Sequence, residues 1–251
     1  MLCRHERVNK VAFTLAEVLI TLAIIGVVAA MTMPTLIQNY QKQVLVTQLK
    51  KSYSLWSQTF QKILADEGVS RLSDTQLWSY IEGNGCSNMP GEGDACARTK
   101  FIPELKKYIK FEGIMGKVEY GSYKNKEAYL IKTNDGTILR YFIFYKTVSR
   151  KDTETCNKIK ELGGNMCSYV GSLTIDVNGH RGPNDIGIDI FYFSISDEGK
   201  LYPFGGKDHA LYMERTDLSS NSFYWKNRNQ SCENFNGCAA RIMENGWKMD
   251  Y

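Results

Sequence analysis

The sequence predicts an α+β protein: a long N-terminal helix, part transmembrane and part amphipathic, packed on an antiparallel β-sheet with disulfide-stapled loops. Three observations predict this. The stretch Phe13–Met33 is apolar and carries one charged residue, Glu17. A three- to four-residue apolar period follows it, and beyond residue 70 the pattern alternates as in strands joined by turns. With a net charge of +4 over 251 residues and no basic run longer than two, no nucleic-acid partner is indicated.

The first segments read as a basic leader, residues 1–12, and a transmembrane helix, residues 13–33. As a helix, the second segment reaches about 30 Å, the thickness of a bilayer core. Positive charge before the apolar stretch places the N-terminus in the cytoplasm and the body across the membrane. A secretory signal peptide fits less well, because the stretch is long and no small-x-small site precedes Pro34. A plain signal anchor is the alternative.

The run K-V-A-F-T-L-A-E-V-L-I-T-L, residues 10–22, resembles the prepilin signature of type IV pilins and type II secretion pseudopilins. The resemblance implies that a prepilin peptidase cuts between Ala12 and Phe13 and methylates the new amine of Phe13. Ala12 stands where the family usually has Gly. Glu17 takes the family's acidic position, and Pro34 matches a frequent helix-kinking proline.

The resemblance further implies a pilin-like fold and a structural subunit of a type II secretion pseudopilus or a type IV pilus. Its implied partners are prepilin peptidase, other pilin or pseudopilin subunits, and an inner-membrane assembly platform driven by a cytoplasmic ATPase. Its implied location is the bacterial inner membrane, single-pass with the body periplasmic, and then a filament or the cell surface.

A carboxylate within a membrane helix is costly and is usually paired. We therefore expect Glu17 of one subunit to neutralise the Phe13 amine of its neighbour, which would also fix the axial register of a filament. The alternative is a Glu17 side chain that reaches the headgroups near the end of the helix.

An amphipathic continuation of the helix is predicted over residues 34–68, where Gly68 is a plausible stop. Residues 69–251 form the predicted globular domain. Short helices are expected around Trp78 and over Phe101–Tyr108, and the segment from Asp208 reads as a polar tail. The expected strands are Glu127–Thr133 and Thr137–Lys146, joined by an Asp-Gly hairpin turn, followed by Gly171–Val177, Asp189–Ser196 and Lys200–Phe204.

Seven cysteines are present, and Cys3 lies in the leader. The others fall into local pairs in loops with Gly and Asn, and such pairs persist as disulfides in an oxidising compartment. A zinc site is the alternative, although no C-x₂₋₄-C spacing occurs. The expected disulfides are Cys86–Cys96, Cys156–Cys167 and Cys232–Cys238.

A polar loop rich in Gly, Asn and Asp lies between two expected strands, within Ile175–Phe191. Hard cations prefer clustered oxygen ligands on such loops, but an EF-hand is excluded because Gly187 stands at its twelfth position. The pattern resembles a loop of pilin-like ectodomains, and some major pseudopilins bind calcium. The alternative is a long turn whose side chains cap their own backbone. The candidate calcium ligands are Asp176, Asn178, Asp185 and Asp189, with Asn184 nearby.

No catalytic site is expected, and the chain does not read as an enzyme. Its three histidines include His180 and His209 in isolated positions, and no H-E-x-x-H, G-x-S-x-G or Walker A pattern occurs. Apart from the calcium alternative, no cofactor is indicated. Two other functions stay open: a membrane-anchored binding module, such as an adhesin or a substrate- or DNA-binding minor pilin with aromatic contacts at Tyr123, Tyr129 or Trp225, and a membrane-anchored periplasmic enzyme.

Overall fold

The computed structural model describes residues 14–84, 97–120, 123–150, 153–161, 165–204, 206 and 237–251. The chain divides into two units, Met1–Lys42 and Gln43–Tyr251, and helix α1 (Leu15–Glu67) contributes to both. The predicted cleavage residues Ala12 and Phe13, together with Cys86, Cys96, Cys232, His209 and Trp225, lie outside the described residues.

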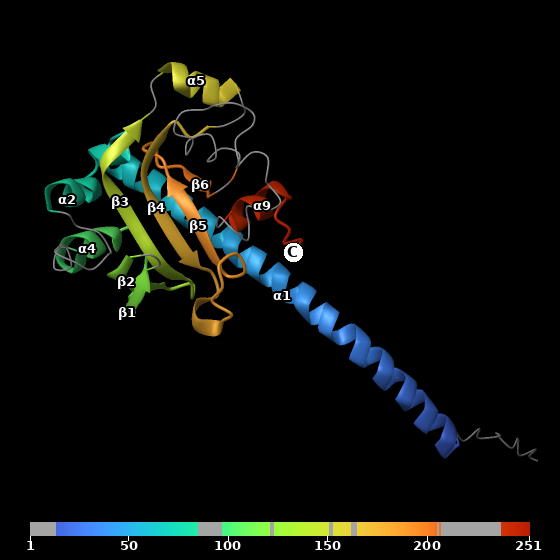
Figure 1. The fold of residues 1–251 in the computed structure, drawn as a ribbon. Helices are drawn as coiled ribbons and strands as arrows, with labels where there is room; N and C mark the ends of the chain where they lie inside the picture. Colours follow the sequence, from blue (N-terminus) through green and yellow to red (C-terminus); the bar gives the residue numbers. More distant parts are fainter. Residues whose placement is uncertain are drawn as a thin grey trace, which may run out of the picture. The chain divides into compact units, whose positions relative to one another are not determined.

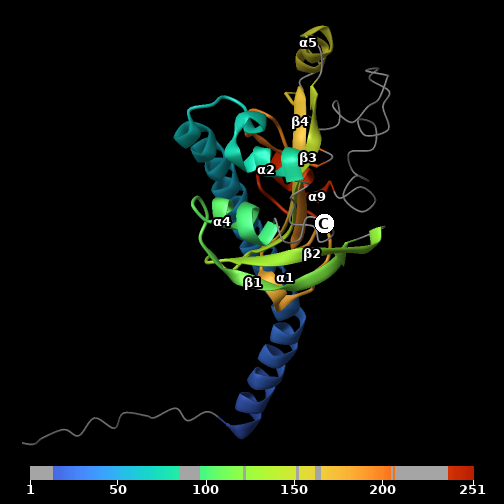
Figure 2. The same cartoon turned by 90° about the vertical axis from the view of Figure 1, so that its left-hand side faces the viewer.

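The second unit contains a six-stranded antiparallel sheet whose strands follow one another in chain order (Figures 1 and 2). This meander confirms the expected antiparallel sheet. The predicted Asp-Gly hairpin joins β2 to β3, and Gly136 adopts φ +88°, which glycine tolerates without strain. The strands are β1 (Phe111–Tyr120), β2 (Tyr123–Thr133), β3 (Ile138–Arg150), β4 (Ser168–Asp176), β5 (Ile190–Ile195) and β6 (Leu201–Pro203).

The second half of α1 lies across one face of the sheet, as Figures 1 and 2 show. Its buried stripe includes Leu49, Trp56 and Phe60, in agreement with the predicted period. The rings of Trp56 and Phe60 lie 5.8 and 5.9 Å from the ring of Phe142 on β3. Gly68 adopts φ +65° directly after the helix, which confirms the expected stop. The helix is thus held by an aromatic core shared with the sheet.

Short helices surround this core. The helices expected near Trp78 and Phe101 are observed, and α2 packs near β3. The helical segments besides α1 are η1 (Leu72–Asp74), α2 (Gln76–Asn84), the π-helical turn η2 (Ala97–Phe101), α4 (Ile102–Leu105), α5 (Thr153–Glu161), η3 (Gly179–Arg181) and α9 (Cys238–Glu244).

The turn between β5 and β6 packs tightly against α1. The Gln61 side-chain amide donates to the carbonyl oxygens of Glu198 (3.0 Å) and Gly199 (3.1 Å). A Cβ at Gly199 would lie 2.9 Å from Leu64 Cδ1, and Gly199 has φ +71°. This turn therefore requires glycine for both its conformation and its close approach to the helix.

Strand β6, which has three residues, forms one edge of the sheet, and two of its backbone carbonyl oxygens accept hydrogen bonds from other parts of the chain. The hydroxyl of Tyr53 on α1 donates to the Leu201 carbonyl oxygen (3.3 Å), and the Gly206 N–H donates to that of Pro203 (3.2 Å). Pro203 itself has no N–H to offer.

One predicted disulfide, Cys156–Cys167, is present, and it connects α5 to the chain entering β4. Cys238, at the start of α9, is also disulfide-bonded, whereas its expected partner Cys232 lies outside the described residues. The zinc alternative is wrong for Cys156 and Cys167. Among the described residues, no group of three or more His, Cys, Asp or Glu side chains is arranged to hold a metal.

Strand β1 and helices α5 and α9 were missing from the sequence prediction, and Cys156 and Cys238, which were expected in loops, lie in these two helices. Strand β1 contains Gly113, Gly116 and charged residues, so its local preference for a strand is weak, and its pairing with β2 includes register irregularities. Helix α9 falls in what reads as a polar tail, yet Ala239 and Ile242 are fully or almost fully buried in the core. A helix of two turns gives too short a period for recognition from sequence.

Candidate functional site

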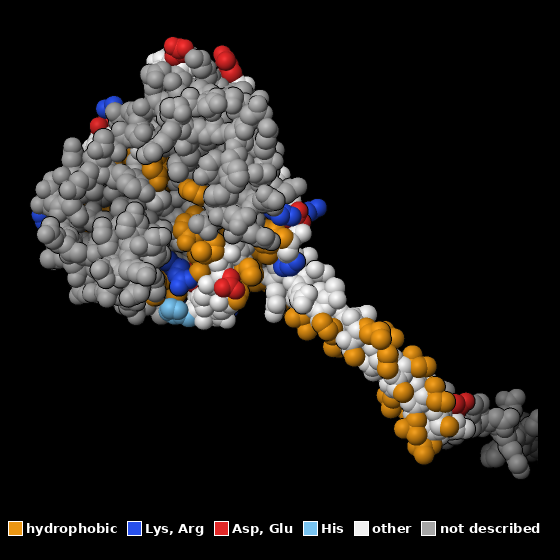
Figure 3. Space-filling view, viewed as in Figure 1, with side chains coloured by type: hydrophobic (Ala, Val, Ile, Leu, Met, Phe, Trp, Pro, Cys, Tyr) orange, Lys and Arg blue, Asp and Glu red, His pale blue; other side chains and the backbone are white. Residues whose placement is uncertain are grey.

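The first candidate site is the apolar part of α1 within the first unit. This helix is long and apolar enough to cross a membrane, and none of its most apolar stretch is buried. Figure 3 shows hydrophobic side chains gathered along it. They occupy successive positions and not a single stripe, for example Leu19, Ile20, Leu22, Ile24 and Ile25, each about 60% exposed. A helix that is apolar all round needs lipid or other helices as its surroundings.

Glu17 belongs to a capping box at the start of this helix. Its Oε2 accepts hydrogen bonds from the backbone N–H and the hydroxyl of Thr14, both at 2.8 Å. In return, the Glu17 N–H donates to Thr14 Oγ1 at 3.2 Å. This reciprocal arrangement satisfies N–H groups that have no partner within the helix. Glu17 therefore has a local structural role that the sequence interpretation missed, although T-x-x-E is a recognisable capping pattern.

Pro34 lies within α1, whose helical assignment continues on both sides of it. A proline there removes one backbone hydrogen bond of the helix. The kink expected at Pro34 stays a prediction, as do cleavage before Phe13 and methylation of its amine.

The second candidate site is the polar loop between β4 and β5. Asp176, the last residue of β4, is 1% exposed, and among the described residues its Oδ1 has no hydrogen-bond partner. Its Oδ2 lies 3.6 Å from Nη1 of Arg140 on β3. The Asn178 side-chain N–H₂ donates to the Gly182 carbonyl oxygen (2.9 Å), while Asn178 Oδ1 is buried with no partner in the part of the chain that the structure describes.

The side chain of Asn184, from the same loop, contacts Asp176. Its amide nitrogen donates to Asp176 Oδ2 (3.0 Å) and to the Gly179 carbonyl oxygen (3.2 Å). The backbone of Gly179 lies close to the β2–β3 turn: a Cβ at this position would lie only 2.9 Å from the Gly136 carbonyl oxygen. Its φ of +69° also favours glycine. The Asn184 amide thus ties the loop to the end of β4 through Asp176 and the Gly179 carbonyl oxygen.

Burial raises the pKa of Asp176 to about 6. The nearby Arg140 guanidinium opposes this increase, and the charge of Asp189 adds to it. The backbone amides of Asn178 and Gly179 also lower the pKa, but neither forms a hydrogen bond to Oδ1. Asp176 is therefore a buried acid whose raised pKa reflects its removal from water more than its neighbours Arg140 and Asn184.

The four candidate ligands from the sequence do not share one role. The carboxylate of Asp189 is fully buried and accepts hydrogen bonds from the backbone N–H groups of Asn184 (2.8 Å) and Asp185 (2.7 Å). Asp185 is exposed. Asp189 therefore caps the loop backbone, as the self-capping alternative expected for such side chains. The sequence interpretation missed Arg140, which comes from a distant strand.

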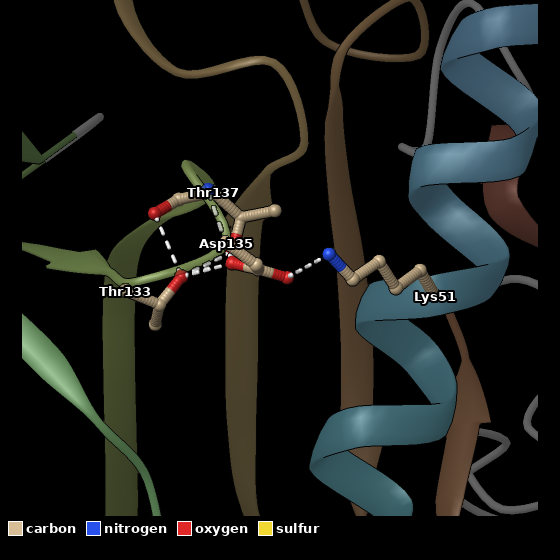
Figure 4. Close-up of polar contacts among 4 residues, drawn as sticks. All are labelled: Lys51, Thr133, Asp135 and Thr137. Atoms are coloured by element: carbon tan, nitrogen blue, oxygen red, sulfur yellow. Dashed lines mark hydrogen bonds and ion pairs between the residues drawn. The ribbon is translucent and has the colours of Figure 1, made fainter.

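A polar cluster supports the loop from the neighbouring β2–β3 turn (Figure 4). Asp135 Oδ1 accepts hydrogen bonds from the Thr137 hydroxyl (2.9 Å), the Thr137 N–H (3.2 Å) and the Thr133 hydroxyl. Its Oδ2 faces Nζ of Lys51 on α1 at 3.7 Å. Burial tends to raise the pKa of Asp135, but these hydrogen bonds and Lys51 outweigh it and lower the pKa below its ordinary value.

A hollow of about 700 Å³ lies between α1, β6 and α9. Among its lining groups, the Tyr53 hydroxyl and the Gln61 amide are already bonded to backbone carbonyl oxygens. The Ser57 hydroxyl is buried without a partner. Asn165, Lys200 and Glu244 also line the hollow, but this mixture of an amide, a cation and an anion favours no single class of ligand.

Comparison with known proteins connects these features to one family. A family model described as a family of unknown function, DUF6613, matches residues 35–251, which is most of the chain. The chain belongs to the DUF6613 family. No curated protein matches it. No solved structure matches it either.

The region matched by the DUF6613 model includes the sheet, the polar loop and the Cys156–Cys167 disulfide, whereas the stretch Phe13–Met33 precedes it. The family description carries no activity, so the functional argument depends on the residues themselves.

Proposed function

We propose that the protein is a pilin-like structural subunit of a type II secretion pseudopilus or a type IV pilus. Residues 13–33 would anchor it in the bacterial inner membrane, with the N-terminus cytoplasmic and the body periplasmic, until it is packed into a filament. The observation that carries the proposal is the N-terminal stretch of α1, which is apolar all round, has no buried residue in its most apolar part and carries a single carboxylate, Glu17.

The exposed apolar surface supports both stages of this proposal. In the membrane, lipid covers side chains such as Leu22 and Ile25, which removes them from water. In a filament, neighbouring copies of the same helix would cover them instead. The energetic exchange between the two environments is small, because lipid tails and aliphatic side chains are similarly apolar. Such a helix suits a subunit that moves between a bilayer and a bundle.

Glu17 would supply specificity to this packing. In the bundle, its carboxylate would pair with the methylated amine of Phe13 on the adjacent subunit, and the capping box with Thr14 would hold the side chain at the helix terminus. The Cys156–Cys167 disulfide supports a body outside the cytoplasm, because such bonds persist in oxidising compartments.

The first test is the intact mass of the protein extracted from the membranes of its native host. The expected mass lacks residues 1–12 and carries one additional methyl group on Phe13. An intact N-terminus would refute processing by prepilin peptidase, and a plain signal anchor or a membrane-anchored enzyme would then explain the segment better.

The second test separates the charge of Glu17 from its capping role. Glu17→Gln keeps the capping box, since Gln serves at this position, but it removes the charge. We expect Glu17→Gln to reduce the sheared filament fraction at least about tenfold at an unchanged membrane level, because a buried amine then lacks its partner. Thr14→Ala is the matched control, which disrupts the box and keeps the charge, and we expect it to assemble. Wild-type assembly of Glu17→Gln would rule out the charge pairing.

A further inference from the structure

We infer that the tip of the loop between β4 and β5 inserts into the surface of a phospholipid bilayer through the side chains of Ile186 and Ile188. The inference rests on the membrane anchor of the proposed function, but not on cleavage, methylation or assembly into a filament. It assigns to the folded body a membrane contact of its own, in addition to the contact made by α1.

The loop exposes two large apolar side chains. Ile186 is 50% exposed and Ile188 is 38% exposed. Within the described residues of the second unit, the other large hydrophobic side chain with such exposure is Val44 on α1, at 36%. One exposed apolar side chain is ordinary on a protein surface. Two of them, separated only by Gly187, form an apolar tip that indicates a contact with something other than water.

Hydrogen bonds hold the tip in this form. The Tyr251 hydroxyl, from the C-terminal segment, donates to the Gly187 carbonyl oxygen at 2.6 Å. The Gly187 N–H donates to the Ile190 carbonyl oxygen (2.8 Å), and the Ile188 N–H donates to that of Asp185 (3.1 Å). These bonds fix the backbone between the two isoleucines, so their exposure is part of the folded structure of the loop.

The backbone of the tip suits an apolar environment. Lipid offers no partner for N–H and C=O groups, so a segment that enters it must satisfy them within the protein. The Asp189 carboxylate accepts hydrogen bonds from the N–H groups of Asn184 and Asp185. The Asp185 carbonyl oxygen accepts those of Asp189 and Ile190, at 3.2 and 3.1 Å. Most N–H groups of the tip are thus already paired, and shallow insertion leaves few of them facing lipid.

The loop lies at the end of the second unit at which α1 enters. The C-terminal part of α1 meets the β5–β6 turn through Gln61, whereas Lys51, earlier in the helix, faces Asp135 in the β2–β3 turn. The backbone of Gly179, in the loop, lies next to that same β2–β3 turn. The loop therefore shares an end of this unit with Gln43, its first residue.

The chain between the apolar stretch and the second unit is short. Residues 34–42 connect the two and lie within α1. As a helix, this connection reaches about 14 Å. The body of an anchored chain therefore stays close to the bilayer, and its loops meet the lipid surface at a high effective concentration. Among possible occupants of the tip, lipid is the one that the chain itself brings within reach.

The exposed charges near the tip suit phospholipid phosphates. His180 and Arg181 are exposed, and Asp185 is the one exposed acidic residue between β4 and β5. Lys248 is also exposed, in the C-terminal segment whose Tyr251 contacts the loop. Basic side chains at the level of the phosphates, with apolar side chains inserted between the lipids, are typical of segments that bind a membrane surface.

The test uses an introduced tryptophan in the full chain, reconstituted in vesicles of phosphatidylethanolamine and phosphatidylglycerol. Lipids with a nitroxide near the headgroup quench the fluorescence of nearby tryptophans, and the wild-type signal is subtracted. We expect Ile186→Trp and Ile188→Trp to be quenched at least about threefold more than Asp66→Trp, because an inserted side chain lies close to the label. Asp66 is exposed near the C-terminal end of α1 and is the matched control for the affinity of tryptophan itself for lipid.

A second variant tests the neighbouring side chain. Adding Ile188→Ser to Ile186→Trp should reduce the quenching at least about twofold, because less apolar surface is then removed from water by insertion. The same Ile188→Ser change should leave the quenching of Asp66→Trp unaltered. Either tryptophan variant at the tip suffices if the other fails to fold.

Flotation of the chain with the vesicles is measured first, and it separates this inference from the proposed function. A chain that does not float lacks the anchor, which would overturn both. A chain that floats, but in which the tip variants and Asp66→Trp are quenched equally, would overturn the inference alone. Tip emission that shifts to the blue as protein density rises, without quenching by labelled lipid, would show that a second copy covers the tip and would also overturn it.

Discussion

Replacing Asp135 should reveal how strongly the β2–β3 turn is attached to α1. The Asp135 side chain is 13% exposed and accepts hydrogen bonds from Thr133 and Thr137 while facing Lys51. A hydrogen bond to a charged group contributes about 1.5–3 kcal/mol, and bonds that share an acceptor are not additive. We therefore expect Asp135→Ala to lower the free energy of unfolding by about 2–3 kcal/mol.

Asp135→Asn isolates the charge, because Asn-Gly forms the same type of turn as Asp-Gly and Asn keeps an acceptor oxygen. Its expected loss is about 1 kcal/mol at neutral pH. Lys51→Met should lose no more than about 1 kcal/mol, since the Lys51 side chain is 65% exposed and the ion pair is screened by solvent. The assay is urea unfolding in detergent micelles followed by the fluorescence of the buried Trp56.

The pH dependence has a defined sign. Because the pKa of Asp135 is lowered in the folded protein, its contribution is fully present above its unfolded pKa of about 4. The contribution disappears as the pH falls through the lower folded value. The difference between wild type and Asp135→Asn should be constant from pH 7 to about pH 5 and should shrink below about pH 4. A difference that grew with acidity, or an Asp135→Ala loss below about 0.5 kcal/mol, would refute the reasoning.

Three further predictions concern the second unit. Gly199→Ala should cost at least about 2 kcal/mol, because the new methyl group meets α1 and the φ is positive, whereas Gly68→Ala, with a similar φ but open space, should cost about 1 kcal/mol; equal losses in urea unfolding would contradict the steric argument. Replacing both Cys156 and Cys167 by Ser should lower the free energy of unfolding by about 2–3 kcal/mol. Added reductant should lower the thermal midpoint of the wild type by more than that of this variant, which no longer contains the bond. Phe142→Ala should cost about 3–5 kcal/mol, and a loss under 1 kcal/mol would show that its aromatic neighbours repack.

Periodic patterns predicted those parts of the fold in which local and tertiary preferences agree. The stripe through Leu49, Trp56 and Phe60 repeats at helical spacing because one face of α1 meets the sheet. The turn at Asp135-Gly136 was predictable because the hairpin needs a residue with positive φ. Strand β1 was not predictable, since its glycines and charges are tolerated only by virtue of its pairing with β2.

The polar loop was predicted as an oxygen-rich turn, but its division of roles was not. Arg140 reaches Asp176 because the β3–β4 register pairs Ile138 with Asp176, and that register is a property of the whole sheet. Asp189 and Asp176 are indistinguishable in sequence, yet the first accepts hydrogen bonds from backbone N–H groups, whereas the second faces the Arg140 guanidinium and the Asn184 amide nitrogen. Which of these two carboxylates faces Arg140 is determined by the fold and cannot be read from the local sequence.

The occupied edge at β6 limits how copies of this protein can associate. An open edge strand is a template for another strand, and copies of a protein at high local concentration can pair through it and aggregate. Here Pro203 lacks a donor, and Tyr53 and Gly206 already use outward carbonyl oxygens of the strand. Pairing of another strand with β6 is therefore disfavoured by residues of the same chain, which leaves β1 as the edge of the sheet at which a further strand would meet open backbone groups.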